Sequence, residues 1–431
     1  MKEDNIREYF TVLIRWIGIA AVAGIPSALV VAAFNSILKY VIARSPALLP
    51  RAPYLIPIVG AFLVGILFLR WKPGSGGEGI PSYIIGVNRD WGRFDPVSTV
   101  LKFPATIVTL GFHGSGGIVG PLARINAGLS SLLVRWITRP FKSDETGYVR
   151  TAAICGVGGA VSAIFHAPLG GGIFAVEILR KDTMRYTDLF PSILSGCAAY
   201  LTSFFLLHQS PIFSVETPSL PVPGKLIVWL PLVVIIAGGF GMTFIIIFEK
   251  IYRLFREVPG KQPAAAVIGG ALICLVWLLN AKWILNTSMP LFAAIGSGDI
   301  TPLQLSASLE SQAPVFFLTV VIVKMLATSF TVSSGLSGGF TGPLIIIGLG
   351  SGAFMTSLIG IDPGSPAYFG FLACALAAVL GGSMNIPIAA IIITARIFGT
   401  QYIMPAVFGG ILSFILFRAR TVYEFYSTSS S

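Results

Sequence analysis

One glycine-rich element occurs twice in this chain, and this repeat constrains the fold more than any other feature of the sequence. A second pair of matching motifs, His166-Ala167-Pro168 and Asn385-Ile386-Pro387, follows it at a similar spacing. Matches at a nearly fixed spacing indicate internal duplication. We therefore predict two homologous halves, residues 1–215 and 223–417, and a short C-terminal segment at 418–431. The nine residues of the first copy that recur 222 positions later are Lys102, Ala105, Thr106, Ser115, Gly116, Gly117, Gly120, Pro121 and Leu122, which match Lys324, Ala327, Thr328, Ser337, Gly338, Gly339, Gly342, Pro343 and Leu344.

Long uncharged segments indicate that the duplicated chain lies in a membrane. A helix of about 20 apolar residues crosses the hydrocarbon core of a bilayer. Only 11% of the residues are charged, against about 25% in soluble domains. We expect an all-α, polytopic integral membrane protein, and we exclude a soluble enzyme or a single span attached to a soluble domain. The apolar stretches are residues 16–38, 52–69, 226–248, 325–361, 363–395 and 397–417, and those at 325 and 363 are long enough to hold more than one segment.

The formal net charge of +11 lies mainly in short segments between the apolar stretches, at 135–150, 180–185 and 250–261. Basic loops of this kind flank membrane helices on the cytoplasmic side, so we expect them to face phospholipid and cytoplasm, with no nucleic-acid partner. Residues 1–15 have no cleavage site, and we expect an amphipathic surface helix or a polar tail there, not a cleaved signal. The four cysteines are isolated and indicate neither a metal site nor a disulfide framework: Cys155, Cys197, Cys274 and Cys374.

The repeated Ser-Gly-Gly-x-x-Gly-Pro element must interrupt a helix, because glycine allows unusual backbone angles and proline lacks a donor. At membrane depth, irregular backbone is tolerated only where it is buried in protein or lines a polar cavity. A helix that begins directly after such a loop offers unpaired N–H groups and the positive end of its dipole, which attract an anion. Two inverted copies direct two helix N-termini at one point. The alternative is that the glycines only allow close helix packing. A third glycine loop, residues 74–81, precedes the first copy.

Taken together, the glycine motifs resemble the signatures of the CLC family of chloride channels and chloride/proton antiporters. The first loop, Gly77-Glu78-Gly79-Ile80-Pro81, is similar to the family's Gly-Ser-Gly-Ile-Pro. The second, Gly117-Ile118-Val119-Gly120-Pro121, is similar to Gly-Arg-Glu-Gly-Pro. The third, residues 338–343, resembles Gly-Gly-x-Phe-x-Pro with the phenylalanine shifted by one place. The run from His166 to Glu177 resembles the family's Asn-Ala-Pro-Leu-Ala-Gly followed by a glutamate.

This resemblance implies a CLC-type inverted repeat of tilted and re-entrant helices. It also implies a homodimer with one pore in each subunit, and cytoplasmic termini in an inner or plasma membrane. The transported partner and expected bound ligand is chloride or another small anion, with no other cofactor, no metal and no catalytic residue. Because the chain ends soon after its last apolar stretch, we expect no cytoplasmic regulatory domain. The resemblance assigns the anion-binding and pore positions to Gly77, Glu78, Gly79, Ile80, Gly117, Ile118, Val119, Gly120, Phe340, Thr341, Gly342 and Tyr423, with Tyr426 as an alternative to Tyr423.

Two positions depart from the pattern of the family's antiporters. In antiporters the glutamate of the second signature gates the pore and carries the proton, and this chain has Val119 there. A second glutamate passes protons to the inner solution, and its position is Ile178 here. Neither side chain can hold a proton. We therefore expect passive anion conduction and no exchange of chloride for protons.

Glu78 stands where the family has a serine that faces the central anion. An ionised carboxylate there repels chloride at close range. Three interpretations are open. Glu78 is protonated and donates its O–H group to the anion; or it is a relocated gate and proton carrier, which makes the protein a proton-coupled antiporter; or it points away and pairs with Lys102, Arg124 or Arg396.

Other charged positions also allow two interpretations. Arg396 follows Pro387 by nine residues, as Glu177 follows Pro168, so the inverted repeat predicts a Glu177–Arg396 ion pair; the alternative is an arginine that snorkels to the membrane interface. Lys102 and Lys324 open the two copies, and we favour membrane-interface anchors over a contribution to the pore potential.

Two further hypotheses concern function. Ser115 and His166 could form a nucleophile and base in an intramembrane protease, but the second half has Asn385 in place of His166. We therefore expect Ser115 to be a helix cap and the protein to have no enzymatic activity. The other hypothesis keeps the fold and changes the substrate, because Glu78 could favour a cation or a neutral solute. We expect Thr341 to add a hydroxyl donor, Phe340 to pack or wall the pore, and His166 to form local hydrogen bonds.

Overall fold

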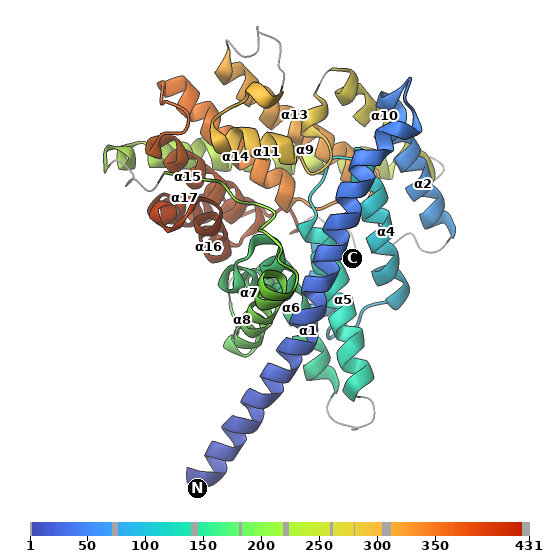
Figure 1. Cartoon of the computed structure of the whole chain (residues 1–431), viewed down its shortest axis with the longest axis vertical. Helices are drawn as coiled ribbons and strands as arrows, with labels where there is room; N and C mark the ends of the chain where they lie inside the picture. Colours follow the sequence, from blue (N-terminus) through green and yellow to red (C-terminus); the bar gives the residue numbers. More distant parts are fainter. Residues whose placement is uncertain are drawn as a thin grey trace.

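A computed structural model describes residues 2–70, 76–138, 145–180, 183–218, 224–258, 262–279, 281–303 and 312–424. All regular secondary structure in these ranges is helical, apart from one isolated antiparallel bridge between Gly117 and Gly339. Within them, eight helices are long and apolar enough to cross a membrane. The expected all-α polytopic architecture is confirmed (Figure 1).

The helices fall into two consecutive sets of similar order and length. The first set is α1 (Lys2–Arg44), α2 (Ile56–Arg70), α3 (Ile80–Asn88), α4 (Pro96–Gly111), α5 (Val119–Thr138), α6 (Glu145–Phe165), α7 (Pro168–Glu177) and α8 (Tyr186–Leu201). The second set is α9 (Leu230–Arg256), α10 (Gln262–Leu278), α11 (Met289–Ser297), α13 (Ala313–Ser333), α14 (Thr341–Ile359), α15 (Pro366–Met384), α16 (Pro387–Phe398) and α17 (Ile403–Phe417).

Four of these helices are about half as long as a bilayer core is thick, or little more. The pair α3 and α11 have 9 residues each, α7 has 10 and α16 has 12. At 1.5 Å per residue they are about 14–18 Å long, against about 30 Å for the hydrocarbon core. Each has a proline at its first or second position, where the missing N–H costs no hydrogen bond. They therefore begin or end inside the protein, as re-entrant helices do.

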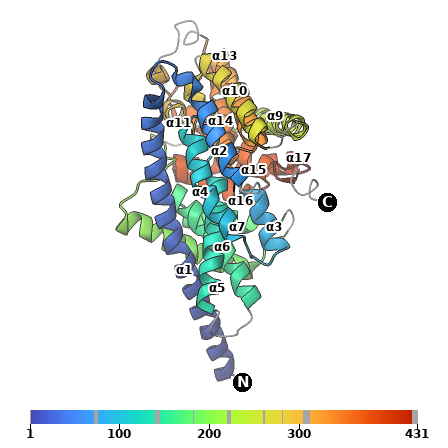
Figure 2. The same cartoon turned by 90° about the vertical axis from the view of Figure 1, so that its right-hand side faces the viewer.

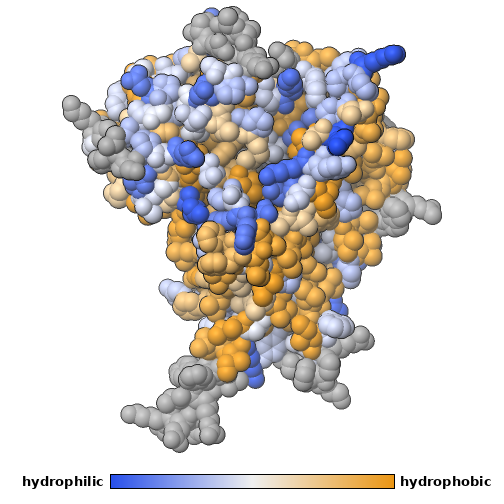
Figure 3. All heavy atoms as spheres, in the orientation of Figure 1, coloured by the Kyte–Doolittle hydropathy of each residue, from blue (hydrophilic) through white to orange (hydrophobic). Residues whose placement is uncertain are grey.

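The helices differ in how deeply they are packed. The buried share of the apolar window is 94% in α15 and 83% in α6, but 39% in α1 and 33% in α17. Residues at the centre of the molecule therefore contact protein on all sides, whereas the outer helices keep apolar side chains for lipid. Figure 2 shows α1 along one edge, and in Figures 1 and 2 its N-terminal turns extend beyond the other helices. A broad apolar surface covers much of the face in Figure 3.

Helix boundaries refine two expectations from the sequence. The N-terminal residues from Lys2 onward belong to α1 and continue directly into the first span, so they form neither a separate surface helix nor a polar tail. The long apolar stretch at 325–361 holds the end of α13 and the whole of α14, and the stretch at 363–395 holds α15 and most of α16.

Residues with a left-handed backbone occur at matching positions in the two sets. Gly77 (φ 66°) before α3 corresponds to Asn286 (φ 56°) before α11. His113 (φ 67°) corresponds to Gly335 (φ 86°), and His166 (φ 51°) to Asn385 (φ 60°). The same turns thus recur although the residue types differ. The exact boundaries of two inverted halves stay a prediction.

Candidate functional site

The second and third signature loops meet at the isolated bridge. The Gly117 N–H donates to the Gly339 carbonyl at 2.7 Å, and the Gly339 N–H donates to the Gly117 carbonyl at 2.8 Å. Directly after the bridge, α5 begins at Val119 and α14 begins at Thr341. Two helix N-termini therefore start from one paired point in the interior.

Hydroxyl groups hold this junction in a reciprocal pattern. The Ser115 N–H donates to the Thr331 hydroxyl at 2.9 Å, and the Ser337 N–H donates to the Thr109 hydroxyl at 3.1 Å. Thr106 and Ser337 share a hydrogen bond of 2.7 Å, and Ser115 and Thr328 share one of 3.1 Å. These hydroxyls were not singled out from the sequence as contacts between the halves. Thr109 and Thr331 lie 222 positions apart, which is the spacing of the nine repeated residues. The repeat therefore identifies the two threonines as an equivalent pair.

The first signature loop touches the second at two glycines. A Cβ atom on Gly79 would lie 2.1 Å from the Gly120 carbonyl oxygen, and a Cβ atom on Gly120 would lie 1.9 Å from Oε1 of Glu78. Neither position has room for a side chain. The three loops therefore converge closely enough that their backbones are in contact.

The Glu78 carboxylate lies at the point of convergence. Its Oε2 accepts a hydrogen bond from the Ile80 N–H at the start of α3, and its Oε1 accepts one of 3.4 Å from the Phe340 N–H just before α14. The residue is 4% exposed. Contact with Gly120 brings it against the second loop as well. A carboxyl group of this chain thus accepts from N–H donors of the first and third signature loops.

This geometry bears on the third interpretation of Glu78, in which the side chain points away and pairs with a basic residue. The side chain does not point away from the junction, although the Lys102 ammonium attracts it electrostatically. Arg124 donates instead to the hydroxyls of Thr99 and Ser98, and Arg396 donates to the His166 carbonyl. Pairing with Lys102 therefore stays open beside the other two interpretations.

The other predicted pore residues surround this point and are buried. Ile80, Val119 and Phe340 are fully covered, and Ile118 is 2% exposed. The Phe340 ring packs against Phe248 with centroids 4.7 Å apart. Gly342 lies against Gly117, where a Cβ would be 2.8 Å from the Gly117 Cα.

Two hydroxyl side chains complete the group of predicted residues. Tyr423 lies 6.2 Å from Phe340 by ring centroids. The buried hydroxyl of Thr341 has no hydrogen-bond partner among the described residues, which leaves it able to bind a ligand. Tyr426 lies outside the described residues.

Two hollows reach the signature loops. One, of about 830 Å³, is lined by Gly117, Ile118 and Gly342, and by the side chains of Lys39 and Lys282. The other, of about 530 Å³, is lined by Gly76, Gly77 and Arg256. Among the described residues that line these two hollows, none is an aspartate or glutamate. Both therefore present positive charge around the approach to the loops.

The two repeat lysines are buried, so the prediction that they anchor the protein at the membrane interface is wrong. Lys102 is 3% exposed and donates to the carbonyls of Gly76 and Gly77 at 3.3 and 2.9 Å. Lys324 is fully buried and donates to the hydroxyls of Ser288 and Ser115 at 2.7 and 3.0 Å. Each lysine holds the loop that precedes a re-entrant helix, α3 or α11. Carbonyl and hydroxyl oxygens replace water as the hydrogen-bond partners of each buried amine.

The predicted Glu177–Arg396 ion pair does not form, whereas Arg396 is exposed in the last turn of α16, in keeping with the alternative of a snorkelling arginine. The Glu177 carboxylate accepts from the Ile388 and Ala389 N–H groups at 3.0 and 2.8 Å, at the start of α16. The Arg396 Nε donates to the His166 carbonyl at 3.0 Å, just before α7. Each side chain therefore satisfies backbone groups at the N-terminal end of the other helix. The inverted repeat brought α7 and α16 together, as expected, but with a different contact.

The comparisons with known proteins agree over nearly the whole chain. A family model described as voltage gated chloride channel matches residues 60–418. An uncharacterized protein of Methanocaldococcus jannaschii is 26% identical over 96% of this chain and 96% of its own length. A chloride/fluoride channel protein of Pseudomonas syringae pv. tomato is 25% identical over 87% of this chain and 78% of its own length.

The fold is also that of solved structures. The structure of a CLC-type fluoride/proton antiporter superposes with a TM-score of 0.78 at 21% identity, covering 96% of this chain and 98% of that one. A slow cyanobacterial Cl⁻/H⁺ antiporter gives a TM-score of 0.76 at 18% identity, with 97% of both chains covered.

Proposed function

The chain belongs to the voltage-gated chloride channel family, whose members move small anions across membranes, and from that premise we propose that it conducts them passively, without coupled proton exchange. The observation that carries this proposal is the pair Val119 and Ile178. Both side chains are aliphatic and buried, at 0% and 6% exposed. The two positions that hold protons in the family's antiporters therefore have no titratable group.

An anion fits the site better than a cation does. The donors at the junction are backbone N–H groups at the starts of α3, α5 and α14, which carry partial positive charge. The hollows that reach the loops are lined by lysine and arginine side chains. Among the described residues that line these hollows there is no carboxylate to replace the water of a cation, and the Glu78 carboxyl at the junction already accepts from two of the backbone donors. We therefore favour an anion over a cation. The expected ligand is chloride or another small halide.

Glu78 supports a second candidate, a proton-coupled antiporter. Its carboxylate accepts from Ile80 and Phe340, where a transported anion would also accept. Protonation would remove the negative charge and release these donors, so one side chain could exchange a proton against an anion. The related structures include a fluoride/proton and a Cl⁻/H⁺ antiporter, which makes this candidate worth separating from passive conduction.

Flux measurements with the purified protein in liposomes separate the two candidates. We expect an outward chloride gradient to drive chloride efflux without moving protons uphill, in the native chain and in Glu78→Gln alike. Uphill proton movement in the native chain that is lost in Glu78→Gln would instead establish the antiporter. Glu249→Gln is the matched control, because Glu249 lies on α9 with Arg253, away from the signature loops. Repeating the assay with fluoride, bromide and nitrate gives the selectivity.

The protein is not an enzyme, since the family consists of channels and transporters. In agreement, the Ser115 hydroxyl forms hydrogen bonds with Thr328 and Lys324, so it is one of the hydroxyl groups that join the two copies of the repeat. His166 instead packs edge-on against the Tyr200 ring, with centroids 5.6 Å apart.

We further propose that two copies form a homodimer with a separate pore in each. The apolar side chains that α8 and α17 leave exposed, among them Leu201 at 51% and Ile415 at 62%, supply a surface for either lipid or a second copy. Cross-linking in native membranes, followed by mass determination, distinguishes a dimer from a monomer. An inner or plasma membrane location with cytoplasmic termini is proposed on the family resemblance alone.

A further inference from the structure

A third hollow, of about 360 Å³, lies apart from the signature loops, at the starts of three membrane spans. These candidate spans lie in α1, α6 and α8, and α6 and α8 line the hollow with residues of their first turns, among them Tyr148 and Asp188. Helices that begin their apolar segments side by side mark one boundary of the hydrocarbon zone. The hollow therefore lies at the level of lipid headgroups. The side chains in its lining that carry the argument are Arg15, Trp16, Tyr148, Arg150, Arg185 and Asp188.

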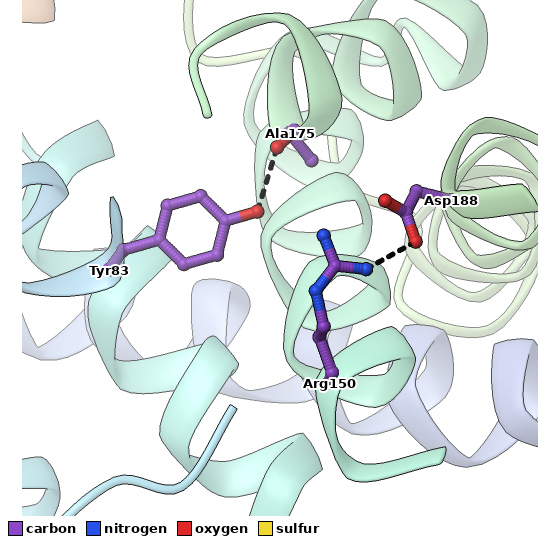
Figure 4. A network of polar contacts seen from close by, with 4 residues as sticks. All are labelled: Tyr83, Arg150, Ala175 and Asp188. Carbon is purple, nitrogen blue, oxygen red and sulfur yellow. Dashed lines mark hydrogen bonds and ion pairs between the residues drawn. The ribbon is translucent and has the colours of Figure 1, made fainter. Parts of the chain in front are cut away.

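Among the described residues of the lining, positive charges outnumber negative ones. Its single described carboxylate, Asp188, forms an ion pair with Arg150 at 2.6 Å, and the two side chains are only 6% and 12% exposed (Figure 4). Arg15 and Arg185 are exposed. Arg15 donates one hydrogen bond to the Tyr148 hydroxyl at 3.0 Å, and a guanidinium has five N–H donors in all. Two exposed guanidinium groups thus remain as binding groups for an anion at the mouth of the hollow.

An apolar surface continues from the hollow along α1 and α8. The Trp16 ring stacks on Phe190, with centroids 6.2 Å apart, and Phe190 stacks on Tyr186 at 6.0 Å. Phe190 is 50% exposed, and Ile14 and Ile17 on α1 are 65% and 50% exposed. Tryptophan and tyrosine rings are typical of the level where headgroups meet acyl chains. An anion bound in this hollow would therefore lie next to apolar side chains of α1 and α8.

We propose that this hollow binds the phosphate-bearing headgroup of an anionic phospholipid. Arg15 and Arg185 contact the phosphate, because arginine matches its oxygens with paired donors. The acyl chains lie along the exposed residues of α1 and α8. Trp91, which is 60% exposed, also lines the hollow and covers the headgroup from the α3 side. None of the lining residues belongs to the signature loops, so this site is independent of the proposed conduction.

The test is lipid binding to the purified full chain in detergent, followed by thermal unfolding as lipid is added. We expect phosphatidylglycerol to bind more tightly than phosphatidylcholine with the same acyl chains. Each arginine near an anionic headgroup contributes about a fivefold change in affinity. We therefore expect Arg15→Gln/Arg185→Gln to weaken phosphatidylglycerol binding about 30-fold, and Arg15→Lys/Arg185→Lys to retain most of it. Arg89→Gln is the matched control, since Arg89 is exposed and lies outside the lining.

Three results would overturn the proposal. One is equal binding of the two lipids, which means that headgroup charge is not recognised. Another is native-like phosphatidylglycerol binding by the double glutamine variant. The third is inorganic phosphate binding as tightly as the lipid, which would assign the hollow to a soluble anion. Because the readout is binding and not flux, a failure here leaves the proposed anion conduction untouched.

Discussion

At the scale of single residues, Glu78 sets the properties of the site. Its carboxylate accepts from N–H groups at the start of α3 and just before α14, and under the proposed function a transported anion would accept from the same donors. An ionised Glu78 therefore competes with the anion for the same hydrogen bonds. A neutral side chain competes less, because only the anionic form gains the full attraction of the helix dipoles.

From this competition we expect chloride flux to rise as pH falls, since protonation removes the charge of Glu78 from the anion path. Glu78→Gln should give a flux at neutral pH several-fold above that of the native chain, and a flat pH profile. The measurement is chloride efflux from liposomes between pH 4.5 and 8. A glutamine variant that keeps the native pH dependence would assign the titration to another group.

Gly120 should show how tightly Glu78 is held. A Cβ on Gly120 would lie 1.9 Å from Oε1 of Glu78, so Gly120→Ala forces the carboxylate out of place. We expect a loss of about 1–3 kcal/mol in stability from overpacking, measured by thermal unfolding in detergent. In Gly120→Ala/Glu78→Ala the contact with the carboxyl group is gone and the nearest remaining atom is the Gly339 Cα at 3.2 Å. The double variant should therefore be more stable than the sum of the single effects predicts. Strict additivity would mean that Gly120 is constrained by its backbone and not by Glu78.

The sequence indicated which residues matter here better than it indicated where their side chains point. Glu78 was placed in the first signature, but its Phe340 partner is 262 positions away, and no local pattern reveals such a contact. Lys102 and Lys324 were misassigned for a related reason. A lysine at the end of an apolar segment usually reaches water. Lys102 and Lys324 instead donate to carbonyl and hydroxyl oxygens of loops that fold back over them, and these oxygens take the place of water.

At the scale of elements, the junction depends on hydroxyl side chains that cross between the two copies. Thr109 on α4 accepts from the Ser337 N–H, and Thr331 on α13 accepts from the Ser115 N–H. Each threonine thus holds the loop of the opposite copy. The repeat predicted equivalent helices, and hence equivalent hydroxyls, but not that each would serve the other half.

Removal of either threonine hydroxyl should lower the stability of the protein by a similar amount. Thr109→Val keeps the shape but leaves the buried Ser337 N–H without its acceptor, which costs about 1–3 kcal/mol. Thr331→Val should do the same through Ser115. Thr243→Val is the control, because Thr243 is exposed and bonds only within its own helix. A thermal unfolding midpoint in Thr109→Val as high as in the control would show that the hydrogen bond between Thr109 and Ser337 does not stabilise the protein.

At the scale of the whole molecule, the fold could be predicted because two constraints act together. Long apolar stretches require every backbone group to be satisfied within a helix, and the duplicated glycine loops specify where helices must break. The order and number of buried spans was not predictable in the same way. In α15, 94% of the apolar window is buried inside the protein. This burial depends on how the helices pack, and their sequences are all similarly apolar.

The positively charged linings should also act at this scale, by raising the local concentration of anions near the pore. Lys39 and Lys282 line the hollow that reaches Gly117 and Ile118. We expect Lys39→Gln/Lys282→Gln to reduce chloride flux several-fold at about 10 mM salt, where the Debye length is about 30 Å, and little at 1 M, where it is about 3 Å. Lys250→Gln on α9, outside this lining, should change neither. The salt dependence separates this field effect from misfolding, since a misfolded variant loses flux equally at both salt concentrations.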